Sequence, residues 1–565
     1  MMKIFPATAS GRDVSLPSFS WFFFLLAGGV FLLISFTSYH YWDEYYYLYS
    51  VGSFSLPELL SLEPGLGKGL FPQAFFSTKI GFVVFLDLLC SMAGQGYGAL
   101  LLIQFCFAMV VLAFAWASWL LLRELLGREN AQYAFLVLLF LPVTMYFGYK
   151  VLSELFGLFF TVLGCTAYLR LLHSGERKAM AGYFFLALAF LLAGVLCRFT
   201  SVVFFGGMVL GLLVLGDRRY PVIRNIVYAA VLSVFLIALT ILFYIFFLGL
   251  TPAELAGFVG AVTVRTPGLA VKIYAVGMTV QLFFLPLLFV FRRALHPHVR
   301  FALVWTLVCS LPFVVVSRYV EPRYFYMALV PMAILVHYGL LQLSGALCGG
   351  KRAALCWMTM LAVIVLANRL LFFSLMPYEL DQKQYAGLKE TTAGLFPAAT
   401  YLVPWVSDYS FLRFAYPEED FRLVWSPPGL ESHDFFRSRS FVSWAGGSSR
   451  YIGSPEAMPD STGTLLYIGW RYNQPVVRLK EKLQWLPGRY VKNVEKDEKL
   501  KNHLALSWIW ADPDLDLEKV AEVEPYEAYL IRPRSAGSLE QAPPVSESGR
   551  LVHENIGTEE RSGER

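Results

Sequence analysis

Long apolar runs over the first two thirds of the chain constrain its fold more than any other feature. A helix that crosses a membrane needs about 20 predominantly apolar residues, and about eleven runs reach or approach this length. They are residues 19–37, 97–122, 131–147, 153–172, 181–196, 199–215, 225–249, 270–291, 300–317, 323–343 and 353–375. Only helices and closed barrels satisfy the backbone inside a bilayer. The sequence therefore predicts an all-α polytopic membrane domain.

Residues 70–92 form a further apolar run, which Lys79 and Asp87 interrupt. Charged side chains are costly in the hydrocarbon region of a bilayer. We therefore expect a helix that packs at the membrane interface and does not cross the membrane.

The charge content agrees with a membrane protein. Only 15% of the 565 residues are charged, whereas a soluble domain carries about 25%. This composition excludes a soluble cytosolic enzyme. The net charge of +5 comes from basic residues scattered among the loops and not gathered on one face, so we expect no nucleic-acid partner.

The composition becomes mixed polar and aromatic after residue 376. We expect a transmembrane domain over residues 1–376 with a long first outer loop at 38–96, and a small extracytoplasmic α/β domain over 377–533. Its β-like runs are residues 400–405, 464–467 and 528–531. Residues 534–565 are poor in apolar side chains and are predicted to be a disordered tail.

The distribution of Lys and Arg predicts the orientation of the bundle. One set of short segments is rich in these residues and holds Lys3, Arg12, Arg123, Arg128, Arg170, Arg177, Lys178, Arg218, Arg219, Arg224, Arg292, Arg293, Arg300, Lys351 and Arg352. Since cytoplasmic loops are enriched in Lys and Arg, the C-terminal part is expected outside the cytoplasm. We expect an integral multi-pass protein of a bacterial inner membrane, with its site facing the periplasm.

Residues 181–215 allow two interpretations. They could form one long helix, which would reverse the side of every later loop and move the basic clusters at 216–219 and 291–293 outward. The charge distribution favours the alternative, a hairpin broken at residues 197–198.

Unusual polar residues follow the first apolar run at the predicted outer side. His40, Asp43 and Glu44 lie in the segment His-Tyr-Trp-Asp-Glu. Two adjacent carboxylates are costly at a membrane edge, which favours a functional role. Adjacent residues of a helix point about 100° apart, so one carboxylate could act as a general base while the other orients the site.

Other predicted outer segments supply cations and further polar groups. They are Lys68, Lys150, Glu154, Arg198, Arg318, Glu321, Arg323 and Tyr324. Guanidinium groups suit bidentate phosphate binding, and Lys supplies a point charge. Each of them alone is typical of a residue that anchors a helix at the interface. Together with the carboxylate pair, they indicate a pocket for a substrate with an anionic phosphate and a neutral acceptor.

The segment Trp42-Asp43-Glu44 directly after an uncleaved first span resembles the GT-C glycosyltransferases, and within them the protein O-mannosyltransferase and lipid A aminoarabinose transferase branch. Lys68 corresponds to the Lys of a Lys-Pro-Pro-Leu-like stretch, although the prolines do not match. The segment 150–154 resembles the second outer loop of that branch, and the segment 321–324 resembles its Arg-Tyr entry into a late span.

The resemblance implies an enzyme that moves a sugar from a polyprenyl-phosphate donor to a protein, lipid or glycan acceptor. Asp43 would be the general base, and Glu44 would assist with the acceptor or act as the base instead. Lys68, Arg323 and Arg318 would bind the donor phosphate. The remaining candidates for substrate binding are His40, Lys150, Glu154, Arg198, Glu321 and Tyr324.

No cofactor and no metal site are expected, although dependence on a divalent metal stays open. The sequence contains no HExxH, no CxxC pair, no GxSxG in triad order and no Rossmann fingerprint. Three other functions remain: a lipid-linked-glycan mannosyltransferase of a related branch, a transporter or flippase, and a partner subunit without catalysis. Transporters bind their substrates near the midplane, whereas the ionisable residues here gather at one face.

Overall fold

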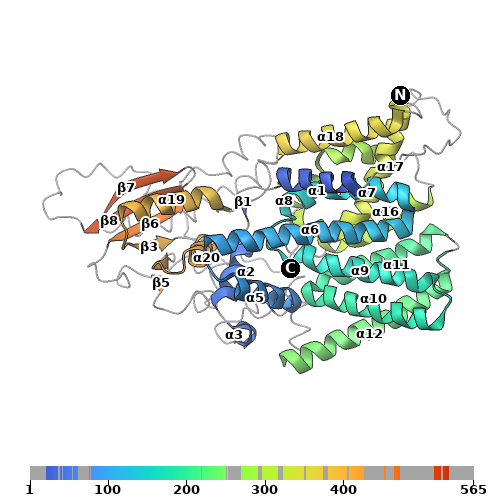
Figure 1. Ribbon diagram of the computed structural model, residues 1–565, viewed down its shortest axis with the longest axis horizontal. Helices are drawn as coiled ribbons and strands as arrows, with labels where there is room; N and C mark the ends of the chain where they lie inside the picture. Colours follow the sequence, from blue (N-terminus) through green and yellow to red (C-terminus); the bar gives the residue numbers. More distant parts are fainter. Residues whose placement is uncertain are drawn as a thin grey trace, which may run out of the picture.

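A computed structural model of the protein describes residues 21–35, 39–40, 42–53, 55–61, 76, 78–217, 219–249, 251, 269–290, 296–315, 322–348, 352–372, 380–403, 406–424, 451–452, 464–470, 515–523 and 526–533. A helical bundle forms the larger part, and a sheet with two helices lies beyond one end of it (Figure 1). We call this end of the bundle the sheet-side end. Helices α2 (Trp42–Ser53) and α5 (Ile80–Ala93) lie there, between the two parts.

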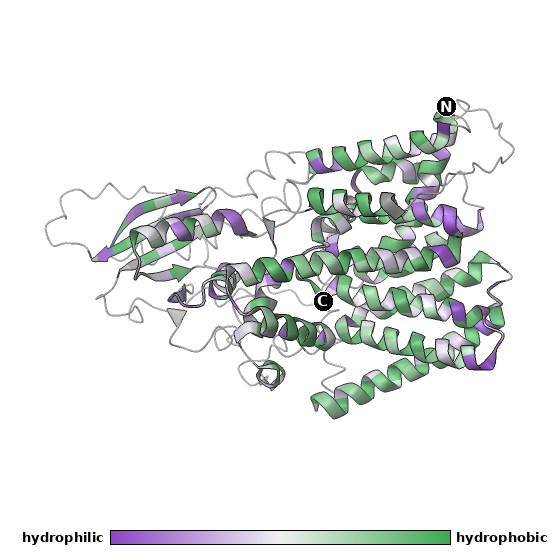
Figure 2. Cartoon of the chain, viewed as in Figure 1, coloured by the Kyte–Doolittle hydropathy of each residue, from purple (hydrophilic) through white to green (hydrophobic). Residues whose placement is uncertain are grey.

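The bundle is built from apolar helices that run roughly parallel or antiparallel to one another (Figures 1 and 2). They are α1 (Trp21–Ser35), α6 (Tyr97–Leu126), α7 (Arg128–Phe140), α8 (Pro142–Phe147), α9 (Ser153–His173), α10 (Arg177–Cys197), α11 (Val202–Leu215), α12 (Val222–Leu248), α14 (Leu269–Val280), α15 (Phe284–Val290), α16 (Pro297–Val315), α17 (Leu329–Cys348) and α18 (Ala353–Phe372). Three short 3-10 helices join some of them: η1 (Phe199–Ser201), η2 (Gln281–Phe283) and η4 (Pro322–Ala328). Helix α17 is buried along almost its whole length and forms the centre of the bundle.

Each predicted span coincides with a helix or with a pair of consecutive helices. In the part of the chain that the structure describes, eight helices are long and apolar enough to cross a membrane, and three shorter apolar helices accompany them. The expected polytopic all-α architecture is confirmed, and the chain is an integral multi-pass membrane protein. The run 131–147 differs in one respect, because it breaks into α7 and α8 at Leu141 and Pro142. Proline has no backbone N–H and cannot continue the preceding helix.

The predicted interfacial run contains helix α5, which has 14 residues. This length is too short to cross a bilayer, for which about 20 residues are needed. Helix α3 (Leu56–Ser61) precedes it, and residues 62–75 lie outside the described part of the chain.

The hairpin interpretation of residues 181–215 is confirmed. Helix α10 ends at Cys197 and α11 begins at Val202, after the 3-10 turn η1. After α11, the Tyr220 hydroxyl donates to the backbone oxygen of Glu124 over 3.0 Å. Arg170 pairs with the Glu124 carboxylate at 3.2 Å. The chain therefore returns after α11 to the end of the bundle where α6 and α9 end.

The C-terminal unit is a six-stranded mixed sheet of order β5-β4-β3-β6-β8-β7. Its strands are β3 (Thr400–Val403), β4 (Phe421–Val424), β5 (Tyr451–Ile452), β6 (Leu465–Trp470), β7 (Leu515–Val523) and β8 (Tyr526–Pro533). Strands β3, β4, β5 and β6 pair in parallel, and β8 pairs antiparallel with β6 and β7. The helices of this unit are α19 (Gln382–Leu395) and α20 (Val406–Ala415). The three predicted β-like runs fall in β3, β6 and β8, and residues 534–565 lie outside the described part.

A two-stranded ladder links the first loop of the bundle to the start of the C-terminal unit. Strand β1 (Tyr39–His40) pairs antiparallel with β2 (Leu380–Asp381). Helix α2 follows β1 after one residue, and α19 follows β2 directly. The ladder therefore holds the beginnings of α2 and α19 side by side.

Candidate functional site

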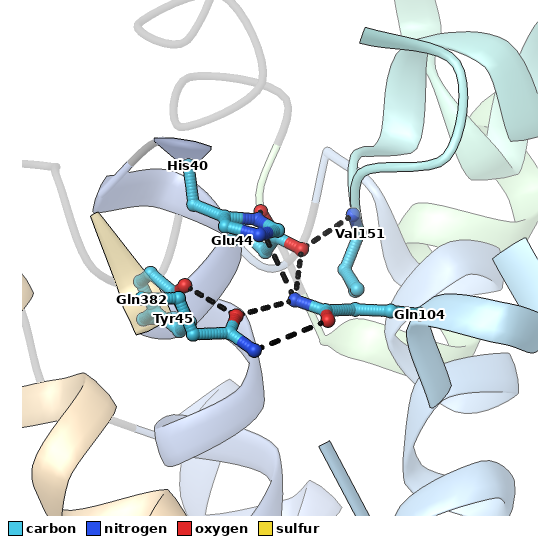
Figure 3. A network of polar contacts seen from close by, with 6 residues as sticks. All are labelled: His40, Glu44, Tyr45, Gln104, Val151 and Gln382. Carbon is cyan, nitrogen blue, oxygen red and sulfur yellow. Dashed lines mark hydrogen bonds and ion pairs between the residues drawn. The ribbon is translucent and has the colours of Figure 1, made fainter. Parts of the chain in front are cut away.

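The carboxylate of Glu44 is the centre of a buried polar network at the sheet-side end (Figure 3). Its Oε2 lies 2.7 Å from Nδ1 of His40, four residues earlier in strand β1. Its Oε1 accepts hydrogen bonds from the Gln104 side chain and from the backbone N–H of Val151, both over 3.2 Å. The Glu44 side chain is fully buried. Three segments, β1, α6 and the connection between α8 and α9, therefore hold one carboxylate in place.

These contacts keep the carboxylate ionised. Burial alone raises the pKa of the Glu44 carboxyl, but the charge and hydrogen bond of His40, the charge of Lys150 and the Val151 N–H together lower it below its ordinary value. Burial lowers the pKa of the His40 imidazole, and the neighbouring carboxylate does not cancel this effect. At neutral pH we therefore assign Glu44 as ionised and His40 as neutral, with its Nδ1–H donating to Glu44.

Lys150 brings a positive charge close to this network. It is buried, and its ammonium group lies 5.2 Å from the ring centre of Tyr149. Burial lowers the pKa of Lys150 to about 8; the Glu44 charge acts in the opposite direction, and Arg369 adds a repulsion that lowers the pKa further. Both the Glu44 carboxylate and Arg369 of α18 are therefore close enough for their charges to act on Lys150.

A second charged cluster surrounds Arg198, which follows the last residue of α10. The Arg198 guanidinium pairs with the Glu154 carboxylate at 3.1 Å and donates to the Ser153 hydroxyl over 3.1 Å. It lies 6.0 Å from the ring centre of Tyr324, and the Arg323 guanidinium lies 5.3 Å from the same ring. Both Glu154 and Arg323 are buried. The guanidinium groups of Arg198 and Arg323 therefore both lie near the ring of Tyr324.

Lys79 is the third cation of this cluster. Its ammonium group donates to the Tyr47 hydroxyl and lies 5.0 Å from the Tyr47 ring centre. Helix α5, which begins directly after Lys79, approaches the end of α10 closely: a Cβ on Gly81 would lie 2.9 Å from Sγ of Cys197. Lys79 and Arg323 also act electrostatically on Glu154. We call Lys79, Arg198, Arg323 and Glu154 the cation cluster.

The cation cluster gathers positive charge in a buried place. Among the described residues, Lys79, Arg198 and Arg323 act electrostatically on the Glu154 carboxylate. Cationic side chains gathered in one place create a positive potential that attracts an anion. Arginine and lysine together suit a phosphate group, because the guanidinium can donate two parallel hydrogen bonds and the ammonium supplies a compact positive charge.

Gly157 of α9 permits the close approach of Arg198. A Cβ at position 157 would lie 2.6 Å from Cβ of Arg198 and 2.9 Å from Oγ of Ser201. We predict that Gly157→Ala displaces Arg198 and weakens binding of a polyprenyl phosphate, measured by titration in detergent. Overpacking also lowers stability by about 1–3 kcal/mol.

Gly164→Ala is the matched control, because a Cβ there would lie 2.8 Å from Leu191 on the same pair of helices, two turns further from the cluster. It is expected to lower the melting temperature similarly and to leave phosphate binding unchanged. Equal binding losses in both variants would contradict the role of Arg198.

The structure places some of the predicted site residues in the Glu44 network and others in or beside the cation cluster. The side chains of the rest lie outside the described part of the chain. The structure brings His40, Glu44 and Lys150 together in the network, and Glu154, Arg198, Arg323 and Tyr324 together in or beside the cation cluster. Lys68, Arg318 and Glu321 lie outside the described residues. Asp43 belongs to helix α2, and only its backbone is described.

Sequence reasoning missed Lys79, Tyr47, Gln104 and Gln382. Lys79 is a basic residue of the predicted outer side that interrupts an apolar run, and the sequence did not indicate it as a site residue. Gln104, a polar residue inside the apolar run 97–122, was the one available signal for the network. Among the described residues, no three His, Cys, Asp or Glu side chains gather in a way that could hold a metal ion, and the expectation that no cofactor is needed stays a prediction.

The bundle, the short helices of the first loop and the sheet after the last long helix of the bundle together form a GT-C-like fold, and the predicted fold class is confirmed. Among solved structures, the chain is similar to ArnT from Cupriavidus metallidurans bound to undecaprenyl phosphate, with a TM-score of 0.52 and 13% identity over 90% of this chain and 97% of ArnT. ArnT in the apo state gives the same values. An oligosaccharyltransferase from Archaeoglobus fulgidus in the apo form has 14% identity over 71% of this chain and 65% of its own, with a TM-score of only 0.41.

The sequence matches no protein-family model and no curated protein. At 13% identity, the likeness to ArnT shows the fold alone.

Proposed function

We propose that the protein is a membrane glycosyltransferase that moves a sugar from a polyprenyl-phosphate donor to an acceptor at the extracytoplasmic face, with Asp43 as general base. The observation that carries this proposal is the cation cluster, which lies at the sheet-side end of a GT-C fold and next to the helix that contains Asp43. The two GT-C crystal structures of ArnT support it by analogy, since one of them is bound to undecaprenyl phosphate.

The backbone of α2 supports different roles for the two adjacent carboxylates. Residues four apart lie on the same face of a helix. Position 43 therefore lies on the face of Tyr47, whose hydroxyl accepts a hydrogen bond from Lys79 of the cation cluster. Position 44 is rotated by about 100° and belongs to the network with His40 and Gln104. We infer that Asp43 serves the reaction and that Glu44 fixes the helix.

The charge of the cation cluster suits the leaving group of the reaction. A polyprenyl-phosphate sugar is a phosphodiester with one negative charge, whereas the released polyprenyl phosphate is a monoester with a charge of about −1.5 to −2 at neutral pH. The three cations of the cluster are therefore better matched to the product and to the transition state that leads to it. Interactions that strengthen as charge develops accelerate the chemical step.

The proposed reaction is a single displacement with inversion. The Asp43 carboxylate accepts the proton of the acceptor hydroxyl while the acceptor oxygen forms a bond to the anomeric carbon. The bond between the anomeric carbon and the phosphate oxygen breaks, and polyprenyl phosphate leaves with the electron pair. Asp43 then returns its proton to water. Lys79, Arg198 and Arg323, together with Lys68 and Arg318 predicted from the sequence, stabilise the charge on the leaving phosphate.

Lys150 is proposed to bind substrate as a cation, which predicts a pH dependence. Because its pKa is lowered to about 8, Lys150 is charged at pH 7 and loses its proton as the pH rises through about 8. We therefore expect kcat/KM to fall over that range. An arginine at position 150 keeps its charge at these pH values. We therefore expect that kcat/KM of the Lys150→Arg protein does not fall as the pH rises through about 8. Identical profiles of both proteins would exclude Lys150 from this role.

The alternatives to this proposal differ in the acceptor, in the sugar or in the function itself. A protein, a lipid or a growing glycan could supply the acceptor hydroxyl, and the last case is the mannosyltransferase of the related branch. The Lys and Arg distribution supports a site on the extracytoplasmic side, and the membrane we propose is a bacterial inner membrane. A transporter or flippase is less favoured, because the buried charge clusters described above lie at one end of the bundle and not at its midplane.

Binding of polyprenyl lipids to the purified protein tests the proposed donor site. Polyprenyl monophosphate is expected to bind at least about tenfold more tightly than the uncharged polyprenol, which corresponds to about 1.4 kcal/mol. The polyprenyl-phosphate sugar should bind with intermediate affinity. Equal affinities for the phosphate and the alcohol would contradict a phosphate site. Flux of the same lipid across proteoliposomes without any sugar transfer would favour the flippase.

A further inference from the structure

We infer that Gln382, at the start of the C-terminal sheet unit, is a positioning residue for the reaction, acting through Gln104 and Glu44 on the helix that carries Asp43. This inference rests on the proposed function. It gives the C-terminal unit a part in catalysis that does not depend on which acceptor the enzyme uses.

A chain of buried hydrogen bonds connects Gln382 to Glu44 (Figure 3). Oε1 of Gln382 accepts from Nε2 of Gln104 over 2.8 Å and from the Tyr45 hydroxyl over 2.7 Å. The same Nε2 of Gln104 donates to Glu44 over 3.2 Å. All four side chains are buried. The network thus joins α19, α6 and α2, which lie far apart in the sequence.

The chemical role of Gln382 is to set the orientation of the Gln104 amide. An amide side chain has a donor end and an acceptor end of nearly the same shape. Oε1 of Gln382 accepts from Gln104 and so keeps the NH2 end of Gln104 toward the Glu44 carboxylate. With the amide reversed, the carbonyl oxygen of Gln104 would face the carboxylate, and one of its hydrogen bonds would become a repulsion. A buried polar network is stable only when each member is satisfied.

The sheet unit holds Gln382 firmly from the other side. Asp381, the preceding residue, pairs with Tyr39 in the β1–β2 ladder, and its backbone N–H donates to the Tyr526 hydroxyl over 2.7 Å. The ring of Tyr526 in β8 stacks on Tyr385 of α19 with a centroid distance of 4.3 Å. Gln382 is therefore anchored to the central part of the sheet, and its amide transmits this position to α2.

The hydrogen bonds of Glu44 also fix the position of the neighbouring residue, Asp43. Since Glu44 is held by His40, Gln104 and Val151, the first turn of α2 cannot rotate without breaking these bonds. The turn also contains position 43. A displacement of a catalytic group by about 1 Å can lower a rate by about 100-fold, so loss of the Gln382 amide should affect turnover more than binding of the donor.

Gln382→Met tests the inference, because methionine has a similar length but no amide. We expect kcat for sugar transfer to fall by about 10- to 100-fold, while the affinity for polyprenyl phosphate stays within about twofold of the wild type. Gln384→Met is the matched control on the same helix; only the backbone N–H of Gln384 is used, in the cap on Asp381. This variant should have the kcat of the wild type.

Two further variants separate positioning from general loss of structure. Gln104→Met should lower kcat as Gln382→Met does, and the double variant should lose no more than the worse single variant, because both act through Glu44. Tyr45→Phe, which removes only the bond from the Tyr45 hydroxyl to Gln382, should lower kcat less.

Wild-type kcat in Gln382→Met would overturn the inference, as would multiplicative losses in the double variant or a loss of donor affinity as large as the loss of kcat. A wild-type protein that transfers no sugar would instead refute the proposed function.

Discussion

A protein with Asp43→Asn is expected to fold, to bind polyprenyl phosphate as the wild type does and to transfer no measurable sugar. Asparagine keeps the shape of aspartate but accepts no proton at neutral pH. A positioned general base contributes about 10²- to 10⁴-fold to a rate, and kcat should fall by at least that factor. Turnover with a saturating donor, together with the affinity for polyprenyl phosphate, measures both parts of the prediction.

Glu44→Gln is the informative comparison for this variant, because the two carboxylates are adjacent. Its new NH2 group would meet donors from Gln104, Val151 or His40 in a fully buried place. Leaving a buried donor unsatisfied costs about 1–3 kcal/mol, so we expect a lower melting temperature as well as lower activity. If Asp43→Asn retained wild-type turnover while a folded Glu44→Gln protein were inactive, Glu44 would be the base.

Removal of one cation from the cation cluster should weaken binding of the donor phosphate strongly. A hydrogen bond to a charged group contributes about 1.5–3 kcal/mol, which corresponds to about a 10- to 150-fold change in Kd. We expect Lys79→Met and Arg323→Met each to weaken binding of polyprenyl monophosphate within this range. Binding of the uncharged polyprenol should not change, since it has no phosphate to contact.

Lys389→Met is the control for loss of a buried lysine charge. Lys389 is also buried, but it pairs with Glu419 in the C-terminal unit, away from the cluster. Its substitution is expected to lower stability and to leave lipid binding unchanged. A Lys79→Met protein that binds the monophosphate as tightly as the wild type does would remove Lys79 from the donor site.

Much of the architecture could be predicted because it depends on local patterns. Apolar runs and the Lys and Arg distribution are properties of the sequence itself, and they predicted the bundle and the break before Arg198. Short β-like runs separated by Pro and Gly likewise predicted the positions of β3, β6 and β8. The break at Pro142 was missed because the apolar run continues across it, although the missing N–H of proline was a visible signal.

The site was harder to predict because its contacts join distant parts of the chain. His40 and Glu44 are only four residues apart, so the sequence already placed them in one segment. Gln382 is 278 residues from Gln104, and no local pattern indicates that the two amides meet. The hydrogen bond of Lys79 similarly joins it to Tyr47, which lies 32 residues away in the sequence. Contacts of this kind follow from tertiary packing, whereas hydropathy reports only on the surroundings of single segments.

The most direct test of the central claim is release of polyprenyl phosphate by the purified protein. The protein in detergent would be incubated with a panel of polyprenyl-phosphate sugars and with membrane extract as a source of acceptors, with Asp43→Asn in parallel. We predict that at least one donor is consumed by the wild type, that polyprenyl phosphate accumulates and that the variant releases none. A folded wild-type protein that consumes no donor, or equal consumption by both proteins, would contradict the assignment as a glycosyltransferase with Asp43 as its base.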